Sequence, residues 1–172
     1  IYDNHYTHSD AEYEELWRLL VNSYALTNRP HNWFFGRLEN WRYAKHDKPP
    51  TFFMDCVHLW RNADAELIGY YISESGDNCI HLQVHPDYGF VEADMLSWVE
   101  CNWTKDRGSI ETYAYHNDDK REKLLTQLGY EDMGHSGNTW QYDLSKPYPA
   151  LDLPPGFQVQ TLADNHNYDS HI

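Results

Sequence analysis

The segment from His81 to Glu100 has the residue pattern best suited to chemistry, because an alternating strand runs into a single glycine and then a helix. Apolar residues recur at every second position up to Val84, as in a half-buried strand, and from Val91 onward they recur at helical spacing. A tight turn between a strand and a helix start presents backbone N–H groups to a phosphate. The turn around Gly89 is therefore where an anionic ligand is expected to bind.

The residues Val84, Pro86 and Tyr88 resemble part of motif A of the GNAT (N-acetyltransferase) family. In that family a strand ending in V-x-P-x-Y-R leads through Q/R-x-x-G-x-G/A to a helix that binds the pyrophosphate of acetyl-CoA. The glycine-rich part is reduced here to Gly89-Phe90, and only Gly89 takes a positive φ at no steric cost, as a nest of amides requires. The resemblance implies acetyl-CoA as the cosubstrate. If this half binds it, the expected contacts are the backbone amides of Val84, Tyr88, Gly89, Phe90 and Val91.

The same resemblance implies a proton-transferring side chain near the splayed fourth and fifth strands. The family often places a tyrosine four residues before the Gly-Phe that follows its last helix, but Leu125 stands there in this sequence, before Gly129-Tyr130. A hydrocarbon cannot donate a proton. Asn117 matches another position often used in the family, although helix capping explains it at least as well. His85 lies at the strand end beside the loop, where it could act as a base. The catalytic residue therefore stays unknown, and His85 and Asn117 are the two candidates.

Histidines and basic side chains offer two weaker candidates. His81 and His85 lie four residues apart on one predicted strand face, about 13 Å along the strand. That separation is too long for both to bind one metal ion without a bulge, and GNAT chemistry uses no metal, so no metal site is predicted. A half-exposed histidine pair is the preferred interpretation. The densest basic cluster is either a solvated helix face or a place to meet an anion, and it comprises Arg37, Arg42, Lys45 and Lys48.

Composition restricts the class of partner. The chain has 172 residues, with 27 acidic and 13 basic side chains and a formal net charge of −14. This charge disfavours nucleic acid as a partner and favours encounter with a cationic small-molecule amine. No apolar run approaches the roughly 20 residues that a membrane helix needs, so no membrane association is expected. Three cysteines without CxxC spacing indicate neither a disulfide framework nor a zinc cage, and they suit a reducing, cytoplasmic location.

Hydrophobic spacing and punctuation predict the elements that would position these residues. Ser9 and Glu12 have capping-box spacing and begin an amphipathic helix, and the Pro49-Pro50 pair is expected to end the unit that contains the second helix. Strands are expected at 1–6, 51–61, 66–73, 79–84, 110–115 and 140–144, and the other helices at 34–45, from 91, and from about 118 to 128, where Gly129 ends the last one. This is the GNAT order. The predicted fold class is therefore α+β (α/β with a mixed sheet): a GNAT-like, mostly antiparallel central sheet flanked by about four helices, with strands 4 and 5 splayed.

The chain changes character after residue 145. Residues 145–156 carry four prolines and predict a stiff linker. Residues 157–164 then alternate like a strand and resemble the P-x-G-[FY]-x-[ILV] opening of another GNAT unit. We expect a GNAT-like domain at 1–145, a linker at 146–156, and at 157–172 the start of a second GNAT unit or a disordered tail. Ile1 is not a methionine, so the chain is expected to begin inside a larger coding sequence.

Two functions from different classes remain. The first is a GNAT-family acetyltransferase that moves an acetyl group from acetyl-CoA to an amine of a small molecule or peptide, with this half non-catalytic and a second GNAT domain in cis as its partner. A homodimer is an open alternative for the assembly. The second function is a GNAT-like binding or structural module with no catalysis, because a shortened phosphate loop and Leu125 both remove chemistry while sparing the fold.

Overall fold

The computed structural model describes residues 1–29, 33–45, 47–103, 108–134, 143, 145–147 and 152–159. The chain divides into two compact units, Ile1–Asp132 and Met133–Ile172. The first unit contains every helix and strand named below, and it is the unit whose fold is described here. No helix in the described part of the chain is both long enough and apolar enough to cross a membrane.

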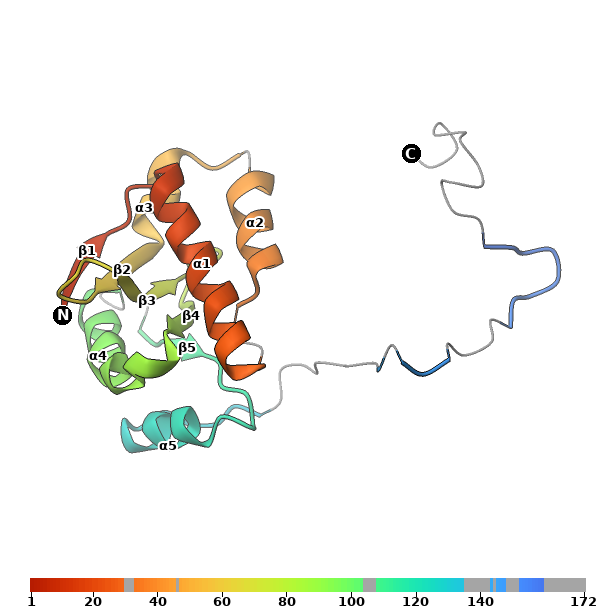
Figure 1. Cartoon of the computed structure of the whole chain (residues 1–172). Coiled ribbons are helices and arrows are strands. Elements are labelled where there is room, and N and C mark those ends of the chain that lie inside the picture. The colour runs from red at the N-terminus through yellow and green to blue at the C-terminus, as the bar shows by residue number, and fades with distance from the viewer. Residues whose placement is uncertain are drawn as a thin grey trace. The chain divides into compact units, whose positions relative to one another are not determined.

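A five-stranded mixed sheet forms the centre of the first unit (Figure 1). Its strands lie in chain order, as β1 (Tyr2–His5), β2 (Val57–Arg61), β3 (Leu67–Ile72), β4 (Cys79–Val84) and β5 (Glu111–Thr112). The first three pairings are antiparallel, and β5 pairs with β4 in parallel. The predicted α+β class with a mostly antiparallel mixed sheet is confirmed.

The helices are α1 (Asp10–Thr27), α2 (Phe35–Ala44), α3 (Pro50–Asp55), α4 (Glu92–Asn102) and α5 (Asp119–Gln127), with a 3-10 helix, η1 (Pro86–Val91), directly before α4. The predicted start of α1 is confirmed, since the Ser9 hydroxyl accepts a hydrogen bond from the Glu12 amide at 3.3 Å. The Glu12 carboxylate accepts from the Thr7 amide at 2.6 Å, which adds a second side-chain bond to this helix start. At the other end Asn28, with φ of 50°, closes the helix in the left-handed conformation.

Helices cover both faces of the sheet (Figure 1). On one face His81 of β4 stacks against Trp33, which precedes α2, with ring centroids 5.9 Å apart. On the other face Trp98 of α4 stacks on His58 of β2 at 3.8 Å. Five of the six residues of β4 are therefore buried, and the expectation of a half-buried strand there was wrong. Polar residues such as His81 alternate with apolar ones in β4, but helix packing covers both sets.

The segment predicted as one strand over 51–61 is instead a helix followed by a shorter strand. Pro50 occupies the first turn of α3, where its fixed φ suits a helix and its missing N–H costs nothing, so the Pro49-Pro50 pair introduces a helix. Phe53 is buried, stacked on His8 at 4.6 Å and edge-on to Trp41 at 4.9 Å. These tertiary contacts outweigh the strand preference of the aromatic residues.

The end of the first unit agrees with expectation in part. Asp118, and not Asn117, caps α5, because its carboxylate accepts from the Arg121 amide at 3.3 Å. Gly129 takes the predicted positive φ, at 86°, after that helix. The strand predicted at 140–144 lies almost wholly outside the described residues, and so does most of the predicted start of a second GNAT unit at 157–172. Phe157 to Val159 are described and form no strand.

Candidate functional site

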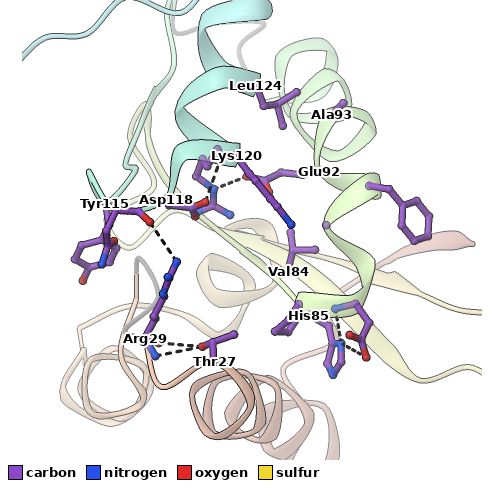
Figure 2. Close-up of a pocket in the computed structure, with 16 residues that line it drawn as sticks. Thr27, Arg29, Val84, His85, Glu92, Ala93, Tyr115, Asp118, Lys120 and Leu124 are labelled. Atoms are coloured by element: carbon purple, nitrogen blue, oxygen red, sulfur yellow. Dashed lines mark hydrogen bonds and ion pairs between the residues drawn. The ribbon is translucent and has the colours of Figure 1, made fainter.

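A pocket of about 660 Å³ lies at the C-terminal end of β4, at the end opposite to the residues of β4 that pair with β5. Four parts of the chain form its wall: the end of α1, the β4–η1 junction, the first turn of α4, and the segment from Tyr115 into α5. In Figure 2, Thr27 and Arg29 of the α1 end lie across the pocket from Lys120 and Leu124 of α5. We call this the β4 pocket.

The loop between β4 and α4 forms a compact 3-10 helix. The Tyr88 amide donates to the His85 carbonyl at 2.8 Å, and the Glu92 amide donates to the Gly89 carbonyl where η1 joins α4. The backbone of Tyr88 is not helical, with φ of −112° and ψ of 18°, so η1 consists of two short turns joined at a kink. The amides of Tyr88 and Glu92 are engaged within this loop. Gly89 does not adopt a positive φ, and a β-carbon there would meet no atom within 4 Å. The backbone conformation of Gly89 is therefore one that any residue can adopt.

Three of the five predicted cofactor contacts line the β4 pocket: Val84, Gly89 and Phe90. Phe90 is 72% exposed. Tyr88 and Val91 are not among the lining residues. The Tyr88 hydroxyl accepts from the Asn62 side chain at 3.1 Å, and Val91 belongs to the buried core, 3% exposed.

Both candidate proton-transfer residues line the same pocket. Nδ1 of His85 accepts a hydrogen bond from the Asp87 amide at 3.3 Å, which orients the ring at the start of η1. Asn117 contributes its backbone carbonyl, which accepts from the Arg29 guanidinium at 3.2 Å. The fold therefore brings His85 and Asn117, which come from separate segments of the chain, into the lining of one pocket.

Three cations of the β4 pocket, Arg29, Lys120 and Arg121, were missed by sequence reasoning. Arg121 of α5 and Glu92 of α4 form an ion pair across the pocket wall, with side chains only 10% and 11% exposed. Arg29 and Lys120 also line the pocket, and neither has a carboxylate ion pair within the described residues. Arg29 follows α1, Glu92 lies on α4, and Lys120 and Arg121 lie on α5, so no local spacing could have linked the three segments. Together they offer cations to an anionic ligand in a strongly acidic chain.

Leu125, Tyr130 and Tyr115 have distinct environments, and of the three only Tyr115 lines the β4 pocket. Leu125 is partly buried against the core, as its apolar character requires, and Tyr130 donates from its hydroxyl to the Glu100 carboxylate at 2.9 Å. Burial and then that hydrogen bond raise the pKa of Tyr130 well above its ordinary value, so this hydroxyl holds its proton firmly. Tyr115, on the pocket wall, was also missed by sequence reasoning.

The predicted half-exposed histidine pair is not found. His81 is 2% exposed, with its ring between Trp33 and Tyr113, whereas His85 lies outside the strand and lines the pocket. Within the described residues no group of three or more His, Cys, Asp or Glu side chains could hold a metal ion.

Three members of the basic cluster make side-chain contacts within the described residues, among them Lys48, which pairs with Asp47 at 3.6 Å and lies over the Phe52 ring at 5.5 Å. Arg37 pairs with Glu74 at 2.5 Å. Arg42 lies over the Tyr13 ring at 4.3 Å and donates to the Tyr6 hydroxyl. The contacts of the two arginines stabilise the packing of α1, α2 and the loop after β3, and neither arginine lines the β4 pocket.

No family model matches this chain, and no curated protein matches it in sequence.

Proposed function

We propose that this chain is a GNAT-like domain of an acetyltransferase that transfers an acetyl group from acetyl-CoA to an amine of a small molecule or peptide, and that this half is non-catalytic. The observation that carries the proposal is the position of the β4 pocket. It lies at the C-terminal end of β4 and against the start of α4, with Tyr115, three residues after β5, on its wall. The GNAT resemblance of Val84, Pro86 and Tyr88 implies a cofactor site at that place in the fold.

Two features support a non-catalytic role for this half. The amides that GNAT enzymes aim at the diphosphate belong here to η1, in which the Tyr88 and Glu92 amides already donate to carbonyls of the same loop. Leu125 occupies the position of the family's proton-donating tyrosine. In this proposal a second GNAT unit in cis carries the cofactor in a cytoplasmic protein. The domain described here shapes the cleft that binds the substrate, and the net charge of −14 aids encounter with a cationic amine.

The second candidate function is a GNAT-like binding or structural module without catalysis. The same engagement of the loop amides in η1 favours it, because the change removes diphosphate binding and leaves the sheet intact.

The first experiment is calorimetric titration of the 172-residue chain with acetyl-CoA. We expect no binding in the micromolar range. A clear isotherm that Lys120→Ala weakens would overturn the non-catalytic assignment, because Lys120 is an exposed cation on the pocket wall with no carboxylate ion pair in the described part of the chain. Lys123→Ala, on the same helix but outside the pocket lining, is the matched control.

The second experiment separates the two candidate functions. A thiol-release assay with acetyl-CoA and a panel of amines is performed on the full-length gene product. Amine-dependent release of coenzyme A supports the acetyltransferase. If the full-length protein neither releases coenzyme A nor binds acetyl-CoA, the result supports a binding or structural module without catalysis.

A further inference from the structure

A second cavity, of about 550 Å³, lies where the edge strand β1 and the adjoining β2 meet the end of α4. We call it the β1–α4 cavity. Its polar lining comes from four elements, with Asp3 and His5 on β1, Asp55 at the end of α3, His58 on β2, and Asn102 at the end of α4. It shares no lining residue with the β4 pocket.

Aromatic rings form one wall of this cavity. Trp98 lies flat on the His58 imidazole, with centroids 3.8 Å apart and planes at 16°. Tyr71 packs beside Trp98 at 5.7 Å. Trp98 is partly exposed, and an indole face of this kind attracts a cation through its quadrupole.

Most polar groups on the cavity wall offer hydrogen-bond acceptors, and His5 adds an imidazole with one N–H donor. Nε2 of His58 lies 2.8 Å from the Asp3 carboxylate, which accepts only, so Nε2 carries the ring proton. Nδ1 is then an acceptor, and it is buried with no hydrogen-bond partner among the described residues. Asn102 donates its side-chain amide to the Trp98 carbonyl at 2.8 Å, which leaves its side-chain oxygen as an acceptor. Asp55 is exposed and adds a second carboxylate.

This lining discriminates between ligand classes. Among the described residues that form the cavity there is no lysine or arginine, so an anion would meet two carboxylates with only the imidazoles of His5 and His58 beside them. The described part of the chain also has no side-chain group suited to a metal ion. An organic cation that carries N–H donors satisfies both the carboxylates and the aromatic wall.

We propose that the β1–α4 cavity binds a small organic ammonium ion, held by the carboxylates of Asp3 and Asp55 and packed against Trp98. This site is separate from the β4 pocket and does not depend on acetyl-CoA chemistry. It gives the chain a means to recognise an amine whether or not the domain takes part in acetyl transfer.

The test is a titration of the 172-residue chain, followed by the indole N–H signals of its tryptophans in two-dimensional NMR at low ionic strength. The probe is butane-1,4-diamine, and its neutral isostere butane-1,4-diol is the ligand control. We expect saturable shifts of the Trp98 and Trp103 signals with the diamine and none with the diol. Equal shifts with both compounds would overturn the proposal, because the charge would then contribute nothing.

Asp55→Asn tests the site within the protein, because Asp55 is exposed and the change is isosteric. We expect about fivefold weaker diamine binding, on the scale of one lost charge contact in water. Asp94→Asn, an exposed acid on α4 outside the cavity lining, should bind as the unchanged protein does. If both variants weaken binding equally, the diamine is attracted to the acidic surface in general and the proposed site is wrong.

Discussion

Glu92 on α4 and Arg121 on α5 form an ion pair that is almost completely removed from solvent. The pair matters for α5 because no apolar residue of this helix is fully buried. Leu124 and Leu125 pack only partly against the core. The ion pair is therefore a principal tether between α5 and the rest of the domain, and it also forms part of the β4 pocket wall (Figure 2).

Arg121→Ala should destabilise the domain by about 3 kcal/mol, because it leaves the Glu92 carboxylate buried without its partner. The measurement is urea unfolding followed by circular dichroism. Arg18→Ala is the matched control, since Arg18 pairs with Glu14 on the surface with side chains 63% and 62% exposed. That exposed pair should contribute less than about 0.5 kcal/mol. Equal losses in the two variants would show that α5 is held by other contacts.

Gly69→Ala should destabilise the domain by about 1 to 3 kcal/mol, because a β-carbon at this position overpacks the α4 face of β3. It would lie 2.9 Å from the Met95 methyl carbon and 3.0 Å from the Gln83 carbonyl oxygen. Thermal unfolding measures the effect. Met95 is fully buried, so Met95→Ala is itself destabilising. It should cost less in the Gly69→Ala background than in the unchanged protein, because there it also relieves the overlap with the new β-carbon.

Gly89→Ala should leave stability within about 1 kcal/mol of the unchanged protein. The reason is that Gly89 has no positive φ and an added β-carbon meets open space. The same unfolding measurement applies. A large loss would mean that the loop needs a conformation other than the 3-10 turn.

Stability should fall as the pH is lowered below the ordinary histidine value of 6.5, in part because of His58. Burial lowers the pKa of His58, and the hydrogen bond to Asp3 only partly opposes this effect. Between the two pKa values the unfolded chain binds a proton at His58 that the folded chain does not. The loss of stability therefore begins near the pKa of His58 in the unfolded chain and stops below its pKa in the folded chain. Urea unfolding between about pH 8 and pH 5.5 measures the slope. His58→Phe should flatten it, and an unchanged slope would assign the effect to other groups, such as His8, whose pKa burial also lowers.

Ser9→Ala should cost about 1 kcal/mol, the usual contribution of a side-chain N-cap. The Ser9 hydroxyl accepts from the Glu12 amide at the start of the 18-residue helix α1. Ser9→Asp restores an acceptor and adds a charge that suits the helix dipole, so its stability should return close to that of the unchanged protein. Denaturant midpoints of the three proteins give the comparison.

Where a structural feature depends on nearby residues, the sequence predicted it well. The capping pair Ser9 and Glu12, the helical spacing that follows, and Gly89 followed by a helix each reflect interactions over a few positions. The segment 51–61 shows where this reasoning fails, since its aromatic residues favour a strand in isolation. In the fold Phe53 is enclosed by His8 and Trp41, and that burial selects a helix. The prediction that His81 and His85 form a half-exposed pair was wrong for the same reason, because α2 and the segment before it, which contains Trp33, cover one face of β4.

Taken alone, the amino-acid order determined the α+β class, the sequence of most elements, and the strand–turn–helix junction at which a pocket was expected. Only the tertiary structure decided what surrounds that pocket and how the loop amides are used. Arg29 and Asn117, for example, meet across 88 positions of the chain, and Glu92 meets Arg121 from a different helix. Periodicity and capping report energies that act along a few neighbouring residues. The charge, burial and unpartnered acceptors of a site arise when segments distant in the chain exclude water together.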